Sequence, residues 1–278
     1  MPITPELYVR STGPKDAPTI LFLHGGGAGS WMWEEVLAQL PDFHCLAPDL
    51  PEHGGSRAVG PFSMELAAEK TAEVIRARAR GGRAHLVGLS EGAQVGVQLL
   101  ASAPELVESA LISSALLFPL PGAGWAANPR LLAWAYRLSI PPFRRADWWI
   151  RLNMRYAAGV PDKYYTQFKK TFQETSESQF VNLMAANQRY RLPAGLEKVT
   201  APVLALSGAK EYPAMKQSAR ALAAALASGQ AAQVNLGAKA SLAAEHNWAL
   251  SAPSLFAQTV RAWITGAALP DALEQLVL

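Results

Sequence analysis

One stretch of five residues, Gly88-Leu89-Ser90-Glu91-Gly92, constrains the fold of this chain more than any other. It matches G-x-S-x-G, a pattern in which a serine occupies a sharp turn between a strand and a helix. An apolar run at 84–87 precedes the turn, and a run typical of a helix at 92–100 follows it. The flanking glycines remove side chains that would collide in so tight a turn. The stretch therefore predicts a serine hydroxyl that projects above a sheet.

Apolar and β-branched runs recur along the chain, with segments typical of helices between them. Predicted strands lie at 19–23, 43–48, 85–89, 110–114, 203–207 and 233–236, and predicted helices lie at 31–40, 64–80, 92–100, 215–227 and 254–264. Alternation at this spacing is typical of an α/β fold with a doubly wound, mainly parallel sheet. With 278 residues, half of them hydrophobic, the chain is long enough to bury one such core and to carry a sizeable insertion.

The alternation stops between residues 117 and 193. This segment shows no clean strand pattern and is rich in proline and aromatic residues. We therefore expect residues 117–193 to be a helical cap, or lid, inserted into an α/β core domain formed by residues 1–116 and 194–278.

The aromatic residues of the predicted cap are expected to serve two different roles. Many are expected to pack the cap onto the core, and the others to form a compact apolar pocket for a small-molecule substrate. The candidate substrate-binding residues are Trp125, Trp148, Trp149 and Trp248.

Composition excludes several classes of protein. Only 17% of the residues are charged and the net charge is +3, which argues against a disordered protein and against nucleic-acid binding. The single cysteine, Cys45, allows no intrachain disulfide. Neither a signal peptide nor a run of 18 uncharged apolar residues is present, so we expect no membrane span and a cytoplasmic location. The oligomeric state remains open.

Acyl transfer by a serine requires a base, an acid that orients the base, and donors for the oxyanion. His246 is the only histidine that follows Ser90, and it lies in a predicted loop beyond the last strand, so we expect it to be the base. Glu211 lies four residues beyond the strand at 203–207 and is the expected acid. Glu245 is disfavoured because the side chains of adjacent residues diverge.

The oxyanion donors are expected to be backbone N–H groups. Glu91 supplies one at the positive end of a helix, and Gly26, with Gly27 as its neighbour, supplies the other. The carboxylate of Glu91 lies unusually close to a developing negative charge, so we expect it to turn into solvent or to accept a hydrogen bond. His24 is expected to hold its turn by hydrogen bonding, and His53, in the turn after the second strand, is expected to be structural.

Cofactor binding and metal chemistry are the rival interpretations of these motifs. A glycine loop after the first strand resembles a dinucleotide-binding fingerprint, but Ser30 and Met32 stand where that fingerprint requires glycine. No phosphate-binding G-x-x-x-x-G-K-[ST] motif, H-E-x-x-H motif or C-x-x-C pair occurs. We therefore expect no cofactor and no metal.

Taken together, the chain resembles the α/β-hydrolase superfamily over nearly its whole length except the cap. The resemblance rests on five motifs in the family's chain order, His24-Gly25-Gly26-Gly27, Asp49-Leu50-Pro51-x-His53-Gly54-x-Ser56, Gly88-x-Ser90-x-Gly92, Gly208-x-x-Glu211 and His246-Asn247-Trp248. Two departures stand out: family members often have Gly where Glu52 stands and Asp where Glu211 stands. A serine nucleophile disfavours the family's epoxide hydrolases and dehalogenases, in which an aspartate is expected.

The resulting prediction is a serine carboxylic-ester hydrolase that cleaves small, largely apolar substrates. Ser90, His246 and Glu211 would act as a Ser-His-Glu triad through an acyl-enzyme, with no cofactor. Two alternatives stay open: a lactonase or C–C hydrolase or lyase with the same triad, and a non-catalytic receptor for small ligands on the same fold.

Overall fold

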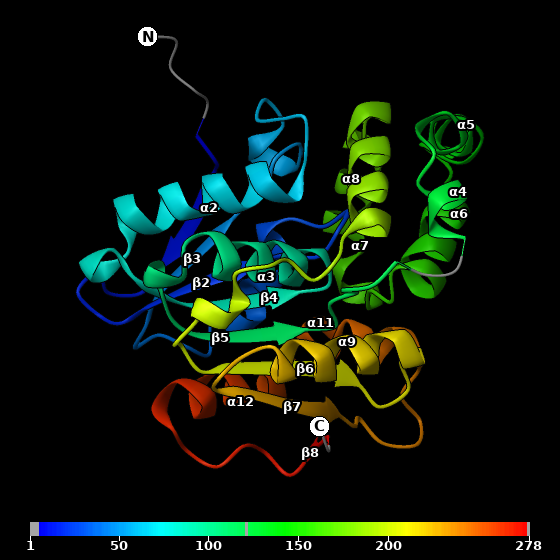
Figure 1. Ribbon diagram of the computed structural model, residues 1–278. Coiled ribbons are helices and arrows are strands. Elements are labelled where there is room, and N and C mark those ends of the chain that lie inside the picture. Colours follow the sequence, from blue (N-terminus) through cyan, green and yellow to red (C-terminus); the bar gives the residue numbers. More distant parts are fainter. Residues whose placement is uncertain (1–5, 120–121, 277–278) are drawn as a thin grey trace, which may run out of the picture.

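The structure is a computed structural model that describes residues 6–119 and 122–276 (Figure 1). Residues 1–5, 120–121 and 277–278 lie outside the described part. The N-terminus on which the signal-peptide expectation rests, and the outer ends of the predicted core domain, therefore fall outside it.

Within the described residues, one sheet of eight strands forms the centre of the molecule, in the order β1-β3-β2-β4-β5-β6-β7-β8. The strands are β1 (Val9–Thr12), β2 (Thr19–Leu23), β3 (His44–Pro48), β4 (Ala84–Leu89), β5 (Val107–Ser113), β6 (Val203–Gly208), β7 (Gly229–Val234) and β8 (Leu273–Gln275). The six inner strands run parallel. The two edge strands pair antiparallel. The doubly wound, mainly parallel sheet predicted from the sequence is confirmed.

The edges of the sheet differ from the prediction. β1 and β8 were not predicted, because both are short and their residues are largely polar, as is common at sheet edges. The last inner strand, β7, covers Gly229–Val234 and so begins four residues before the predicted run at 233–236.

Helices cover both faces of the sheet (Figure 1). They are α1 (Glu34–Leu37), α2 (Met64–Arg78), α3 (Glu91–Ser102), α4 (Ala123–Ala126), α5 (Pro129–Ser139), α6 (Asp147–Leu152), α7 (Tyr165–Glu174), α8 (Glu177–Arg189), α9 (Pro213–Ala224), α10 (Leu242–His246), α11 (Trp248–Ser251) and α12 (Pro253–Thr265). Alternate residues of β2 show the two layers, because Leu21 and Leu23 pack with α2, α3 and α9, whereas Ile20 and Phe22 pack with α1, α11 and α12. Burial on both faces explains the continuous apolar runs of the inner strands.

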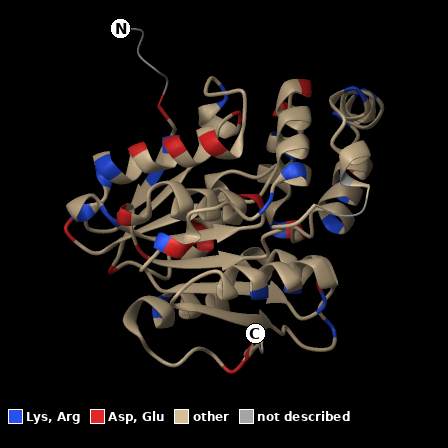
Figure 2. Cartoon of the chain, viewed as in Figure 1, with Lys and Arg blue, Asp and Glu red and all other residues tan. Residues whose placement is uncertain are grey.

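Charged residues lie mostly on the outer helices rather than on the strands (Figure 2). Helix α2 begins at the N-cap Ser63, whose hydroxyl accepts a 3.1 Å hydrogen bond from the N–H of Leu66. Glu65 lies in its first turn and Arg76 and Arg78 in its last, so the charges complement the helix dipole.

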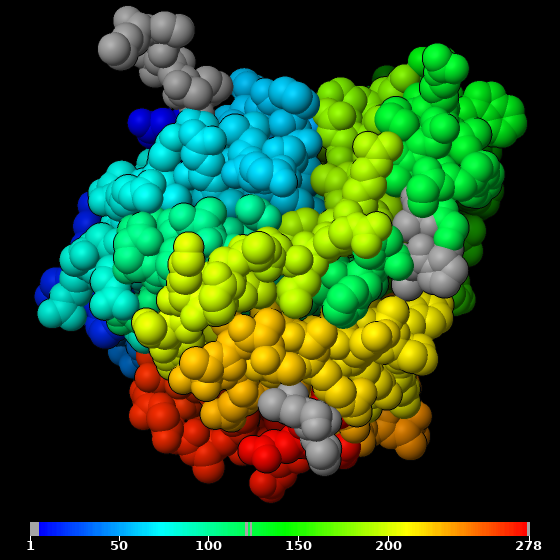
Figure 3. Space-filling view, in the orientation of Figure 1, coloured from blue at the N-terminus to red at the C-terminus, as the bar shows by residue number. Residues whose placement is uncertain are grey.

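Helices α4 to α8 follow one another between β5 and β6, and the described residues between these two strands include no strand. We call residues 117–193 the cap segment, the division proposed from the sequence. It forms the green to yellow-green part of Figure 3, and in Figure 1 its helices lie towards the carboxyl ends of the core strands. Helix α8 lies between α5 and the core in Figure 1 and packs against α4 and α5.

Candidate active site

Ser90 lies in the turn between β4 and α3, as the sequence predicts. Its backbone has φ 56° and ψ −116°, a strained conformation for a residue other than glycine. Its N–H donates to the carbonyl of Ser113 at 2.8 Å, which fixes the turn to the neighbouring strand. A Cβ on Gly92 would lie 2.2 Å from the carbonyl oxygen of Leu23, so the helix packs against β2 only because this residue is glycine. The hydroxyl is thereby held at the carboxyl end of the sheet.

Ser90, His246 and Glu211 form a series in which each side chain is hydrogen bonded to the next. The Oγ of Ser90 lies 3.0 Å from Nε2 of His246, and Nδ1 of His246 is hydrogen bonded to the Glu211 carboxylate. The same carboxylate accepts the N–H of Gly208 at 2.6 Å and the hydroxyl of Ser114 at 3.1 Å. Because Glu211 is buried and accepts from three donors, its carboxylate is fixed in both position and orientation.

The expectation that His246 lies in a loop is wrong. It is the last residue of the one-turn helix α10, whose N-cap Ser241 accepts a 3.1 Å hydrogen bond from the N–H of Ala244. The next residue, Asn247, donates from its side chain to the carbonyl of Ala158 in the cap segment. The imidazole is therefore positioned from both its own helix and the cap.

Glu245 has a separate role, although it is adjacent to His246. Its side chain is fully buried and accepts the backbone N–H groups of Lys210 at 2.6 Å and Leu236 at 3.3 Å. It therefore joins the loops that follow β6 and β7, and Glu211 alone of the two bonds to the imidazole.

Among the described residues, two backbone donors lie free beside Ser90, one in the glycine loop after β2 and one at the first residue of α3. The N–H of Gly25 points to Sδ of Met32 at 3.4 Å, and the N–H of Gly27 donates to Nε2 of His53 at 3.4 Å. Within the described part of the chain, the N–H groups of Gly26 and Glu91 have no hydrogen-bond acceptor. These are the two donors proposed from the sequence.

His24 and His53 hold the turns around this loop. The N–H of Leu50 donates to Nε2 of His24 at 2.9 Å, and Nδ1 of His24 bonds to the carbonyl of Gly25 at 2.9 Å. Nδ1 of His53 bonds in the same way to the carbonyl of Pro51. Burial lowers the pKa of His24 and lowers the pKa of His53 to about 3. Both rings are therefore neutral at physiological pH.

The Glu91 side chain contradicts both expected outcomes, solvent exposure and a hydrogen bond. It is 1% exposed, and neither carboxyl oxygen has a hydrogen-bond partner among the described residues. Burial without a partner raises the pKa of Glu91 well above its usual value.

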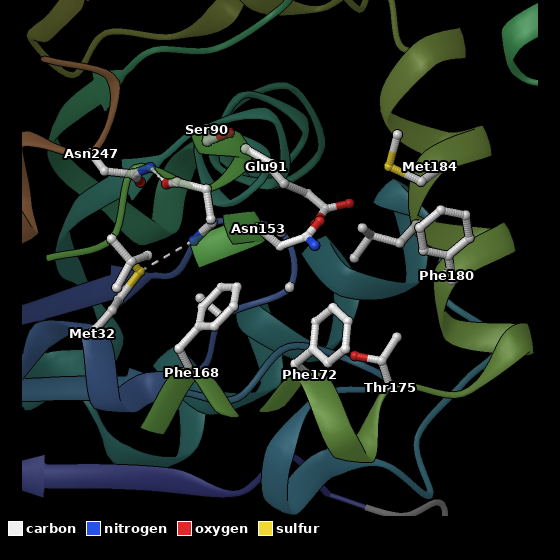
Figure 4. A pocket seen from close by; sticks show the side chains of 18 of the residues that line it. Met32, Ser90, Glu91, Asn153, Phe168, Phe172, Thr175, Phe180, Met184 and Asn247 are labelled. Atoms are coloured by element: carbon white, nitrogen blue, oxygen red, sulfur yellow. Dashed lines mark hydrogen bonds between the residues drawn. The ribbon is translucent and has the colours of Figure 1, made fainter. Parts of the chain in front are cut away.

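A cavity of about 400 Å³ opens over Ser90 between the core and the cap segment. The core contributes the glycine loop, Ser90, Glu91 and His246. The cap contributes mainly apolar side chains, Leu183 among them, and Figure 4 shows Phe168, Phe172, Phe180 and Met184 around the pocket. The cap side of the cavity is thus mainly apolar, with a few polar side chains such as Gln179 among its lining residues.

None of the four tryptophans proposed as substrate-binding residues lines this cavity. Trp125 and Trp148 are 74% and 63% exposed. Trp149 packs on Phe143 and donates from Nε1 to the carbonyl of Ser139. Trp248 is fully buried in the core, where it packs on Phe256 and its Nε1 donates to Ser113 Oγ at 2.9 Å. The structure therefore places all four tryptophans outside the lining of this cavity.

The sequence did contain a signal for the correct cap residues. Phe180, Leu183, Met184 and Asn187 all line the cavity and follow the spacing i, i+3, i+4 and i+7 along α8. This spacing puts the four side chains on one face of a helix. Trp31, which precedes α1, also lines the cavity and was missed.

Glu52 connects the core to the cap. It has φ 63°, the left-handed backbone conformation for which glycine is better suited. Its carboxylate accepts the hydroxyl of Ser178 at 2.6 Å and the amide N–H of Asn182 at 3.0 Å, both on α8. The departure from the usual family glycine therefore supplies a polar contact that holds α8 over the cavity.

No helix in the described residues is both long enough and apolar enough to span a bilayer. Within the same residues, no cluster of three or more His, Cys, Asp or Glu side chains has a geometry suited to a metal ion.

A model of the alpha/beta hydrolase family matches residues 20–269 of the chain. The chain belongs to this family. Among curated proteins, this alpha/beta hydrolase is 34% identical over 114 residues to an AB hydrolase superfamily protein of Gibberella zeae, a match covering 40% of each chain. It is 42% identical over 93 residues to the esterase Rv0045c of Mycobacterium tuberculosis, over 33% of this chain and 30% of that protein. The matches thus cover less than half the length of these relatives.

Solved structures resemble this hydrolase over more of its length. A thermophilic esterase from Thermogutta terrifontis superimposes with a TM-score of 0.73, covering 94% of this chain and 93% of the other, at 20% identity. Identity this low shows a shared fold and leaves the substrate undetermined.

Proposed function

We propose that the protein is a serine carboxylic-ester hydrolase that acts on small, largely apolar esters through a Ser90-His246-Glu211 triad. The observation that carries this proposal is the series of contacts from Ser90 Oγ to His246 Nε2, at 3.0 Å, and from His246 Nδ1 to Glu211. The series opens into a cavity with a mainly apolar lining, and esterases occur among the relatives.

The first half-reaction forms an acyl-enzyme. Nε2 of His246 takes the proton of Ser90 Oγ as the oxygen bonds to the ester carbonyl carbon. The N–H groups of Gly26 and Glu91 donate to the carbonyl oxygen as it becomes an oxyanion. The C–O bond to the alcohol then breaks, and the imidazolium returns its proton to the leaving oxygen.

The second half-reaction consumes one water. His246 takes a proton from the water as its oxygen bonds to the acyl carbon, and the bond from that carbon to Ser90 Oγ breaks. The proton passes back to Ser90, and the carboxylic acid leaves. Throughout, the Glu211 carboxylate orients Nδ1–H and stabilises the imidazolium.

The test measures turnover of p-nitrophenyl butyrate by the wild type and by Ser90→Ala. We expect kcat to fall by more than about 10³-fold in the variant, with unchanged circular dichroism, because among the described residues Ser90 supplies the hydroxyl that is hydrogen bonded to His246. Ser102→Ala is the matched control, since this serine lies at the far end of the same helix and bonds only within it. Retained activity in Ser90→Ala would contradict the proposal.

A further inference from the structure

The carboxyl group of Glu91 is the most unusual polar group in the molecule. Buried polar groups in proteins are almost always hydrogen bonded. Of the fully buried side-chain oxygens and nitrogens without a partner in the described residues, only the two of Glu91 belong to the lining of the cavity. Such a group inside a substrate pocket is a donor or acceptor left for the substrate.

The carboxyl is packed into the wall of the cavity, with almost no surface exposed on either oxygen. A Cβ on Gly26 would lie 2.7 Å from Oε2 of Glu91, so the glycine makes room for the acid as well as for the oxyanion. Leu183 of α8 lies against the same position. Figure 4 shows the Glu91 side chain extending from the turn beside Ser90 towards the α8 side of the pocket. The acid therefore lies next to the site of reaction.

The three asparagine side chains that line the cavity are engaged within the protein. Nδ2 of Asn187 donates to Gln94 Oε1 at 3.0 Å, and Nδ2 of Asn153 donates to a backbone carbonyl at 2.9 Å. Nδ2 of Asn247 bonds to the carbonyl of Ala158. Each of these amides is therefore held by one hydrogen bond within the protein, whereas the Glu91 carboxyl has none among the described residues.

Charge decides which form of the acid occupies the site. Among the described residues that line the cavity, Glu91 and His246 are the only acidic or basic side chains. No Lys or Arg is present to stabilise a carboxylate, and burial raises the pKa of Glu91. A neutral carboxylic acid has an O–H donor that a carboxylate lacks.

We propose that Glu91 is a specificity residue whose neutral carboxylic acid donates a hydrogen bond to a second oxygen of the substrate, a keto, ether or hydroxyl oxygen near the scissile carbonyl. The inference rests on the proposed ester hydrolysis and narrows its substrate class to esters that carry such an acceptor. The apolar residues of the cap pack against the remainder of the substrate.

An ammonium group on the substrate fits this site less well. It would require an ionised Glu91 within an apolar lining, at a high desolvation cost for both charges. An ionised Glu91 would also lie one residue from the serine that generates the oxyanion, where its charge opposes catalysis. A neutral acid carries neither penalty.

The test compares p-nitrophenyl hexanoate with its 4-oxo, 5-oxo and ammonium-capped analogues. For the wild type, we expect kcat/KM to be about tenfold or more higher for one oxo ester than for hexanoate, the scale of one hydrogen bond to a buried group. Glu91→Gln, which keeps an N–H donor, should retain most of this ratio, and Glu91→Leu should lose it. Using ratios within each variant removes any common effect on the adjacent backbone donor, and Glu105→Gln, an exposed glutamate, is the control.

The pH dependence gives a second readout that does not require Glu91→Leu to fold. The oxo-to-hexanoate ratio of the wild type should fall as the pH rises through the pKa of Glu91, because the carboxylate has no proton to donate. The ratio of Glu91→Gln should not change. Gly26 and Leu183, which pack on the acid, do not titrate, and His246 affects both esters alike.

Three results would overturn the inference. One is an equal oxo-to-hexanoate ratio in the wild type, Glu91→Gln and Glu91→Leu. Another is a preference of the wild type for the ammonium-capped ester that Glu91→Gln loses. In both cases hexanoate would still be hydrolysed and Ser90→Ala would still be inactive, so the proposed function would stand. If no ester is hydrolysed at all, both proposals fail.

Discussion

The core wall and the cap wall of the cavity are built in different ways. On the core side, Ser90, His246 and Glu211 lie at the carboxyl end of the sheet and are joined by directional hydrogen bonds. On the cap side, Phe168 and Phe172 present carbon atoms that make no directional contacts. Hydrogen bonds fix atoms to a geometry, whereas apolar surfaces adapt to the shape that fills them. We therefore expect the core to control the rate of reaction and the cap to control affinity.

Glu91 and Glu52 connect the two walls. Glu91 belongs to the core helix α3 and lies beside Gly26, as Leu183 of α8 also does, and Glu52 belongs to the loop after β3 but bonds to Ser178 and Asn182 of α8. Variants of these residues test how independent the two walls are.

The largest effect in the comparison should come from Glu211→Gln. The amide cannot stabilise the imidazolium, and it presents N–H groups to Nδ1 of His246, so the ring loses its working orientation. We expect kcat to fall by about 10³- to 10⁴-fold with KM within a few-fold of wild type. Steady-state kinetics of Glu245→Gln supply the matched control beside His246. A greater loss in Glu245→Gln than in Glu211→Gln would contradict the account.

A change in the cap should act on KM instead. Phe172→Ala removes apolar surface from the cavity, and we expect KM for an aliphatic ester to rise about tenfold with kcat within about threefold. Trp148→Ala, which removes an exposed aromatic of the same segment, should leave both constants unchanged. A fall in kcat at constant KM in Phe172→Ala would break the division between the two walls.

A smaller effect is expected when the contact between the walls is removed. Glu52→Gly deletes the acceptor for Ser178 and Asn182, and glycine adopts the positive φ without strain. We expect KM to rise about threefold and kcat to stay within twofold, because α8 is held less firmly over the cavity. An unchanged KM would show that apolar packing alone positions α8.

The pH dependence of the stability of Glu91→Gln tests the protonation of Glu91, which lies where the core wall and the cap wall meet. Burial raises the pKa of Glu91 in the folded protein, while the unfolded chain releases this proton above about pH 4.5. The wild type is therefore destabilised progressively as the pH rises from about 4.5 towards the folded pKa, by up to about 1.4 kcal/mol per pH unit.

Glutamine has no titratable proton, so Glu91→Gln does not lose stability as the pH rises through this range. Thermal unfolding should show Glu91→Gln with a Tm a few degrees above wild type at pH 7 to 8 and no higher than wild type at pH 4. A difference in Tm that does not depend on pH would mean that Glu91 does not hold a proton in the folded state.

The core was predictable from sequence because its signals are local. The run Thr19-Ile20-Leu21-Phe22-Leu23 has a strand's composition, and β2 covers these same residues. The edge strands β1 and β8 were not predicted, because each forms by pairing with a neighbouring strand and its own composition shows no strand pattern. His246 was assigned to a loop because a single helical turn, capped by Ser241, is too short for a periodic pattern.

The cap wall was less predictable. Aromatic content located the segment that lines the cavity but not the residues, and the tryptophans chosen lie elsewhere. The state of Glu91 depends on the close approach of Gly26 and of Leu183 from a distant helix. A contact between residues so far apart in the chain leaves no local pattern in the sequence. The sequence therefore predicted that the Glu91 carboxyl would face solvent or accept a hydrogen bond, and it does neither.

The central claim is that Ser90 is an activated nucleophile, and covalent labelling tests it most directly. The account predicts that a fluorophosphonate adds one adduct to the intact wild-type protein, that peptide mapping places it on Ser90, and that Ser90→Ala gains none while Ser102→Ala labels as wild type does. An unlabelled wild type, or an adduct on another residue that persists in Ser90→Ala, would contradict it.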